Sequence, residues 1–279
     1  MIKTGIFTKT YQTTNLNDVF CRMTAQKLCH AQLNLSSAGL PSLPDTIEEK
    51  QLEEISSLAR HHGITLDALS GTFNMIDPEE ARRQKGCEQF RLQCEIASIL
   101  QIPVITLCTG SRNRKSQWEW HDDNLKQSSW DVLMRSTDAI IPLSETYHIT
   151  LGVETEASNI INTPERARQY LDMVGSPCLK IIMDGANLFL PHQVPDMKQV
   201  LTEAFELLGK DIVLAHAKDF SFDGTNITFT AAGEGILDFP YYVQLLKQYG
   251  YTGGLIMHGL DETQAPKSRS FLEEVLAHA

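Results

Sequence analysis

The 279-residue sequence contains no long apolar run and little that is typical of a secreted protein. No segment approaches the roughly 20 apolar residues that a membrane-spanning helix needs. The opening segment, Met1 to Thr8, lacks the apolar core of a signal peptide. The six cysteines include no Cys-x-x-Cys pair, and their low density argues against a disulfide-stapled fold. We therefore expect a soluble, cytoplasmic protein with reduced thiols and no membrane partner.

Positive charge is also scarce. The chain has 24 lysines and arginines against 35 acidic residues, which gives a formal net charge of −11. Nucleic-acid-binding proteins usually present a positive surface, so this balance argues against a nucleic-acid partner. A small anionic substrate is still compatible with the composition, because a single local cationic pocket would be enough to bind it.

Short apolar segments alternate with helical patterns along the whole chain. The predicted strands are 2–7, 31–35, 64–69, 104–108, 149–154, 179–184, 212–216 and 254–258. Eight strand–helix units with no break in composition predict one α/β domain over residues 1–279, closed into a (β/α)8 barrel with a parallel sheet. Residues 8–16 contain no glycine, whereas an open doubly wound sheet usually carries a Gly-rich phosphate loop after its first strand.

Two polar segments interrupt this alternation. Residues 109–127 contain Trp118 and Trp120 and are predicted to form a long loop over the ligand-binding face. Residues 220–239 are predicted to form a Gly-rich excursion after the seventh strand.

Four predicted strands end on a residue that can offer a lone pair to a cation: Glu154, Asp184, His216 and His258. They are 30, 32 and 42 residues apart, which is close to one strand–helix unit each. The carboxyl ends of parallel barrel strands meet on one face, where barrel enzymes keep their reactive groups. A mixed oxygen and nitrogen set favours Mn²⁺, Zn²⁺, Fe²⁺ or Co²⁺ over Ca²⁺, and Mg²⁺ is a further candidate. One such residue alone would be read as a polar strand cap, but four at matching positions predict a metal site.

Two charged residues follow these ends at a spacing of two, which places them on the same side of an extended segment. Glu156 is a candidate substrate contact or a hydrogen-bond partner of a metal ligand, and the alternative is a helix cap or a solvated side chain. Lys218 is a candidate for binding a substrate oxygen or phosphate. An ion pair with Asp219 or Glu234 explains Lys218 equally well.

Further candidate substrate contacts lie in the segments after the strands. Asn187, three residues past Asp184, could bind ligand hydroxyls or cap a helix. Glu234 lies between two glycines, which either let the backbone approach a ligand or simply form a turn. Arg112 and Trp118 in the long loop are the last two candidates, although each alone is compatible with a solvated arginine and a packed tryptophan.

Several short motifs accompany these positions: Gly152-Val153-Glu154, Met183-Asp184, His216-Ala217-Lys218-Asp219 and Gly233-Glu234-Gly235. Together they resemble the xylose-isomerase-like TIM-barrel family over essentially the whole chain. That family includes sugar and sugar-phosphate isomerases and epimerases, inosose dehydratases and apurinic endonucleases. Resemblance to its ketose-epimerase branch implies a divalent metal held by Glu, Asp, His and Glu, with two of the carboxylates moving the substrate proton. Glu154, Asp184 and His216 match the first three ligands, but His258 stands where the family has Glu, and Asn187 stands where it often has His.

These observations lead to one principal hypothesis, a metal-dependent isomerase or epimerase of a small sugar, polyol or sugar phosphate. Glu154 would be the catalytic base, and His258 would be a fourth ligand or the acid on the opposite face of the substrate. The alternatives are a lyase resembling inosose dehydratase and a barrel that binds metal or sugar without turnover. DNA repair is the least favoured, and the sequence leaves a homo-oligomer open.

Overall fold

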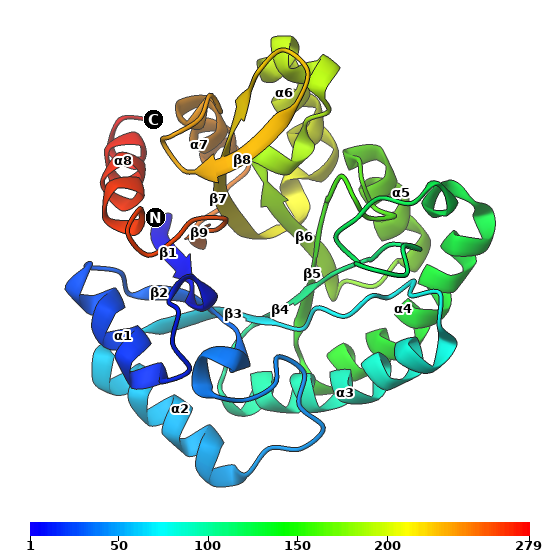
Figure 1. The fold of residues 1–279 in the computed structure, drawn as a ribbon, viewed down its shortest axis with the longest axis vertical. Coiled ribbons are helices and arrows are strands. Elements are labelled where there is room, and N and C mark those ends of the chain that lie inside the picture. Colours follow the sequence, from blue (N-terminus) through cyan, green and yellow to red (C-terminus); the bar gives the residue numbers. More distant parts are fainter.

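The short apolar segments form a closed ring of strands in the computed structural model, which describes residues 1–279 (Figure 1). The ring strands are β1 (Lys3–Phe7), β2 (His30–Leu33), β3 (Thr65–Ser70), β4 (Val104–Leu107), β5 (Thr150–Glu154), β6 (Leu179–Asp184), β7 (Ile212–Phe222) and β9 (Gly254–Met257). Each pairs in parallel with its neighbours, and β1 pairs with β9 while β6 pairs with β7. The predicted (β/α)8 TIM barrel is therefore confirmed.

Eight helices surround the ring, and several begin or end at the signals that the sequence carries. They are α1 (Leu16–Ala25), α2 (Glu49–His62), α3 (Glu80–Ile99), α4 (Gln127–Tyr147), α5 (Pro164–Val174), α6 (Met197–Leu208), α7 (Phe239–Gln248) and α8 (Ala265–His278). Asn15 caps α1 by accepting a hydrogen bond from the amide of Asp18, and Thr163 caps α5 in the same way. None of the helices combines the length and the apolarity that crossing a bilayer requires.

Apolar side chains are buried in two clusters. The larger cluster contains 64 buried residues and includes helix aromatics such as Phe20, Phe90 and Phe205, each fully buried. Burying one such ring stabilises the fold by about 1.5–3 kcal/mol. The smaller cluster contains one residue from each of five strands: Ala68, Val104, Ile182, Leu214 and Ile256. The strands therefore bury both faces, which explains their nearly continuous apolar sequences.

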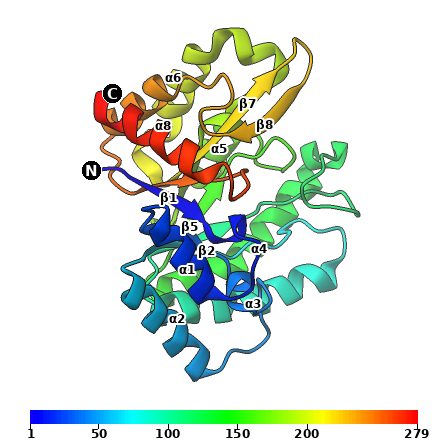
Figure 2. The ribbon, with the colours of Figure 1, turned by 60° about the vertical axis from the view of Figure 1, so that its left-hand side comes forward.

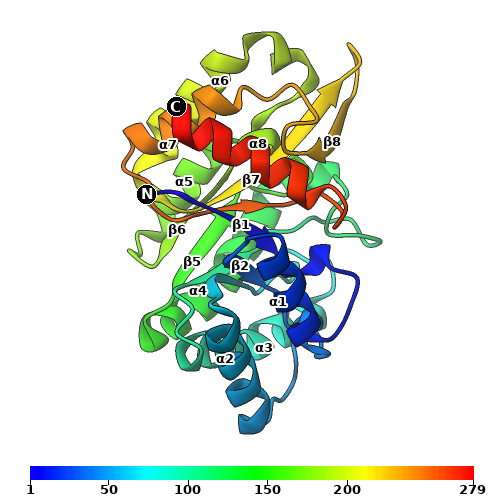
Figure 3. The same ribbon diagram turned by 90° about the vertical axis from the view of Figure 1, so that its left-hand side faces the viewer.

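The seventh strand is longer than predicted, and the Gly-rich excursion predicted after it contains a further strand. β7 continues past His216 to Phe222 and pairs antiparallel with an extra strand, β8 (Ile227–Ala231). Apolar and polar residues alternate on both sides of an Asp223-Gly224 turn, which is a hairpin signal that the sequence did contain. Figures 2 and 3 show this hairpin projecting from the same end of the barrel as the loop before α4.

The predicted loop before α4 is held in place by three buried asparagines. The side-chain oxygens of Asn159, Asn74 and Asn124 accept hydrogen bonds from the amides of residues 110, 111 and 112 at 2.7, 3.1 and 2.7 Å. Gly110 has a φ of +84°, and a Cβ there would collide with Asn74. These contacts hold the first residues of the loop in place just after the carboxyl end of β4.

Candidate metal and substrate site

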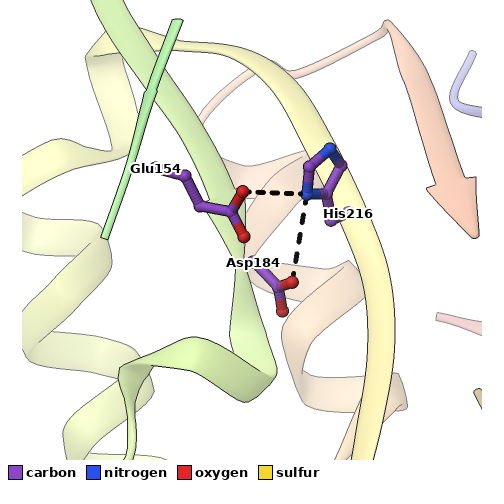
Figure 4. A group of neighbouring side chains, drawn as sticks. All are labelled: Glu154, Asp184 and His216. Carbon is purple, nitrogen blue, oxygen red and sulfur yellow. Dashed lines mark ion pairs between the residues drawn. The ribbon is translucent and has the colours of Figure 1, made fainter. Parts of the chain in front are cut away.

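Three donor side chains from consecutive strands meet at the carboxyl end of the barrel (Figure 4). Glu154 and Asp184 are the last residues of β5 and β6, and His216 lies on β7. One potential ligand atom from each lies within 4.8 Å of the others. His216 Nδ1 is 3.4 Å from Glu154 Oε2 and 3.9 Å from Asp184 Oδ2. The predicted convergence of these three residues is therefore present in the structure.

The hydrogen bonding of this cluster suits a cation. Asp184 is fully buried and His216 is 2% exposed, yet Asp184 Oδ2 and His216 Nδ1 have no hydrogen-bond partner. Buried polar atoms are nearly always paired, because leaving one unpaired costs about 1–3 kcal/mol. Carboxylate oxygens and an imidazole nitrogen are good ligands for Mn²⁺, Zn²⁺, Fe²⁺ or Co²⁺. These three residues fit a divalent metal ion.

Asn187 connects the cluster to two further charged residues. Its side-chain nitrogen donates to Glu154 Oε1 at 2.6 Å and to Glu156 Oε2 at 3.0 Å. Its side-chain oxygen accepts a hydrogen bond from Lys218 Nζ at 2.6 Å. Asn187 is therefore no helix cap, since its amide fixes the orientation of both glutamates.

Lys218 supplies the positive charge of the site. Its ammonium lies 3.5 Å from Asp184 Oδ2 and 4.0 Å from the centre of the Phe229 ring on β8. Neither of the partners expected from the sequence holds it. Asp219 instead accepts hydrogen bonds from three backbone amides of the loop after β8, at residues 233, 235 and 237.

Burial and charge shift the pKa values of the acidic groups in opposite directions. Burial opposes ionisation of Glu154, but the positive charges of His216 and Lys218 outweigh it and lower its pKa. Burial and the charge of Glu154 raise the pKa of Glu156 to about 7. Burial also raises the pKa of Asp184. Two glutamates of one strand end thus differ in proton affinity, a pattern that often marks distinct acid and base roles.

The pKa values of the basic groups also differ. Burial lowers the pKa of His216, but the negative charges of Glu154 and Asp184 raise it by a larger amount, so the net shift is upward. The pKa of Lys218 is raised because the surrounding carboxylates outweigh the effect of burial. Burial and the nearby charge of His216 lower the pKa of His258 to about 3. His258 is therefore a neutral imidazole at physiological pH.

His258 lies beside the cluster but not within it. Its ring stacks on the His216 ring, with centroids 5.0 Å apart and planes 10° apart, and on the Phe7 ring at 5.2 Å. Its Nδ1 is buried without a partner, yet His258 does not belong to the group of ligand atoms within 4.8 Å of one another. The role of fourth ligand stays a prediction.

A cavity opens above the cluster at the mouth of the barrel. Glu154, Glu156, His216 and His258 line it, together with Trp118, which is 53% exposed. The remaining lining residues are mostly uncharged and polar: Gln32, Asn34, Ser70, Thr72, Thr106 and Asn159. Such a lining offers hydrogen bonds to a ligand with many hydroxyl groups.

Two predicted substrate contacts lie apart from this cavity. Arg112 donates from Nη1 to the carbonyls of residues 76 and 77, and so ties the long loop to the segment after β3. Glu234 accepts a hydrogen bond from Gln264 at 2.7 Å and pairs with Lys267 at 3.3 Å. The structure does not bring either side chain to the cluster.

Sequence reasoning missed Gln32 of β2, whose Oε1 lies 2.9 Å from His216 Nε2. Gln32 is 4% exposed and stands between Ala31 and Leu33, both fully buried. A polar residue inside an apolar strand was the signal that could have identified it.

In barrel enzymes the reactive groups lie at the carboxyl ends of the strands, and Glu154, Asp184 and His216 meet at that end of this barrel. The chain belongs to the xylose isomerase-like TIM barrel family, whose model matches residues 31–275. It is 25% identical over 215 residues to L-ribulose-5-phosphate 3-epimerase UlaE of Salmonella typhi. This alignment covers 74% of this chain and 69% of the relative. Its homologues include sugar epimerases and isomerases.

Solved structures agree on the fold. The 3-keto-D-glucoside 4-epimerase YcjR of E. coli superposes with a TM-score of 0.75 at 16% identity, over 98% of this chain and 100% of that chain. A xylose isomerase-like TIM barrel protein from Mycobacterium smegmatis, solved in complex with magnesium, superposes with a TM-score of 0.75 at 13% identity, over 99% and 97% of the two chains.

Proposed function

We propose that this protein is a divalent-metal-dependent isomerase or epimerase of a small sugar, polyol or sugar phosphate. The observation that carries the proposal is the pair of buried atoms without a hydrogen bond, Asp184 Oδ2 and His216 Nδ1, beside Glu154. Similarity to a sugar-phosphate epimerase supports the reaction class.

Glu154, Asp184 and His216 would hold the metal ion, and His258 is the candidate for a fourth ligand. When bound, a divalent cation stabilises the negative charge that develops on a substrate oxygen as the neighbouring carbon loses its proton. His258 suits a ligand better than a proton-delivering acid, because its imidazole is already neutral with a pKa of about 3.

The glutamates divide the proton handling between them. Glu154 is ionised, and its Oε1 is oriented by Asn187, so it is the group that would accept the proton from the carbon beside the substrate carbonyl. Glu156 has a pKa of about 7 and holds a proton in part of the molecules at neutral pH. One oxygen of Glu156 accepts from Asn187, so the other can donate a hydrogen bond to a substrate hydroxyl or carbonyl oxygen.

The walls of the mouth would position the substrate. Trp118 presents an exposed ring that can pack against the apolar face of a sugar. The amide and hydroxyl groups that also line the cavity, including those of Asn34 and Thr72, can bind hydroxyl groups. Lys9 also lines the mouth and provides a cation for an anionic group of the substrate. Lys218 is engaged by Asp184 and Asn187, so we expect it to act through them.

The test is a Glu154→Gln variant assayed on a panel of ketoses and ketose phosphates, with bound metal measured in the same samples. We expect turnover to fall by about 10²–10⁴-fold, the usual contribution of a positioned base. Glu145→Gln is the control, because Glu145 accepts a hydrogen bond from Ser176 at the surface, far from the mouth in the fold. Full metal loading with unchanged turnover in Glu154→Gln would remove Glu154 from the catalytic role.

His258 in place of a family carboxylate keeps a lyase as the second candidate, since dehydration of a keto-polyol needs one base but no second carboxylate. Mass analysis of the product separates the two reactions: dehydration lowers the mass by one water, whereas epimerisation conserves it. Bound metal with no turnover of any substrate in the panel would favour a barrel that only binds.

A further inference from the structure

One uncharged residue contacts the Glu154–Asp184–His216 group from the other side of the barrel. Gln32 lies on β2, and β1 and β9 separate β2 from β7 in the ring. Its side chain is buried, and its Oε1 is 2.9 Å from His216 Nε2. Its Nε2 donates to Ser70 Oγ on β3 at 3.3 Å. Gln32 thus links His216 to a hydroxyl across the barrel interior.

When His216 is the neutral ligand of a metal ion, this contact decides which of its nitrogens carries the hydrogen. A neutral imidazole has one N–H donor and one lone pair. A carbonyl oxygen opposite Nε2 accepts a hydrogen bond, so the hydrogen belongs on Nε2 and the lone pair on Nδ1. Nδ1 is the nitrogen that faces Glu154 and Asp184. The hydroxyl of Ser70 can donate or accept, so it is compatible with this orientation of the Gln32 amide.

We infer that Gln32 is a positioning residue that sets the tautomer and ring orientation of His216 for binding a divalent cation. The inference rests on the proposed function, because it requires a metal at Glu154, Asp184 and His216. Metal-ligating histidines commonly donate their second N–H to a fixed acceptor, and loss of that acceptor costs about 10–100-fold in metal affinity.

Calorimetric titration of the metal-free chain with Mn²⁺ and with Zn²⁺ tests this role. Gln32→Met keeps the length of the side chain but has no oxygen acceptor, and we expect the Kd to rise about 10–100-fold. Gln32→Glu keeps an acceptor opposite Nε2, and we expect it to bind metal at least as tightly as the native chain. Ser70→Ala is the matched control: it removes the far end of the link and leaves the His216 contact, so its loss should be smaller than that of Gln32→Met.

A second measurement separates orientation from packing. In the Zn²⁺-loaded protein labelled with ¹⁵N-histidine, the Nε2–H signal of His216 reports its hydrogen bond directly. We expect this proton to shift upfield in Gln32→Met and downfield in Gln32→Glu, with little change in Ser70→Ala. A purely structural role for Gln32 would leave the Gln32→Glu signal unshifted.

The outcomes that contradict the inference are distinct from those that contradict the proposed function. If the native chain binds neither Mn²⁺ nor Zn²⁺, both are wrong. If the native chain binds metal and Gln32→Met has the same Kd, this inference alone is wrong. If Gln32→Met and Gln32→Glu lose affinity equally, the loss comes from packing, and again only this inference is wrong.

Discussion

The barrel contains a histidine–carboxylate contact at each end, and the two differ in what they leave unpaired. At the amino ends of the strands, His30 Nδ1 lies 3.1 and 3.0 Å from the two oxygens of Asp67. At the carboxyl ends, His216 Nδ1 lies 3.4 and 3.9 Å from Glu154 and Asp184 and makes no hydrogen bond. The first pair is hydrogen-bonded, whereas His216 Nδ1 and Asp184 Oδ2 in the second make no hydrogen bond.

Burial sharpens the contrast. The side chains of His30 and Asp67 are 19% and 14% exposed, so water can help to solvate them. His216 and Asp184 are 2% and 0% exposed, so solvent does not replace the missing hydrogen bonds, and Asp184 Oδ2 has only the charge of Lys218 at 3.5 Å. A histidine next to a carboxylate is therefore not by itself a sign of function. In a barrel the amino end usually contributes stability and the carboxyl end carries the chemistry. The hydrogen bonding follows that division, because it is complete between His30 and Asp67 and incomplete at His216 and Asp184.

The largest expected effect concerns the charge balance at the carboxyl end. Lys218→Met would leave the buried carboxylate of Asp184 without its cation, and we expect the metal-free chain to lose about 3–5 kcal/mol of unfolding free energy in urea. Lys267→Met is the control, since Lys267 pairs with Glu234 at the surface and should change stability by no more than about 1 kcal/mol. Equal losses in the two variants would remove the distinction between the buried and the exposed pairs.

The second effect is a pH dependence of stability at the carboxyl end. Burial and Glu154 raise the pKa of Glu156 from an ordinary 4.5 to about 7. The folded state therefore binds this proton more tightly than the unfolded state, so the stability that it contributes is full below about pH 4.5 and lost as the pH rises through about 7. Between pH 5 and 8, the metal-free native chain should lose more unfolding free energy than Glu156→Gln. Parallel stability curves would contradict the shifted pKa.

The smallest effect is expected at the amino end. Asp67→Asn removes the carboxylate that contacts His30, and we expect a loss of about 1 kcal/mol or less in unfolding free energy. Metal affinity and turnover should match those of the native chain, because the pair is remote from the strand ends that carry the donors. A clear loss of metal binding in Asp67→Asn would show that the two ends are coupled.

Local sequence signals were enough to predict the ring and three of its donors. Each barrel strand is a short apolar segment, and parallel pairing alone brings Glu154, Asp184 and His216 together once the strands are aligned. The same reasoning grouped His258 with them by position. It could not anticipate that the His258 ring would stack flat against His216, because ring orientation depends on packing against Phe7.

What the sequence did not reveal depends on contacts between distant, uncharged groups. Asn187 joins two glutamates and a lysine through one amide, and no spacing rule indicates that arrangement. Gln32 meets His216 across 184 positions of the chain. The strand β8 is a different case: its alternating residues and Asp223-Gly224 turn were visible, but the glycines of the segment suggested a loop.

The order of the strands gives the ring closure a consequence for assembly. Glu154, Asp184 and His216 come from neighbouring strands β5, β6 and β7, so their meeting needs only that part of the sheet. The partner of His216 on β2 is in reach only after β1 has joined β9. A chain that lacks residues 1–32 would keep Glu154, Asp184 and His216 but lose Gln32, which orients the imidazole of His216. The affinity of the site for a metal ion therefore reports whether the N-terminal and C-terminal strands have paired.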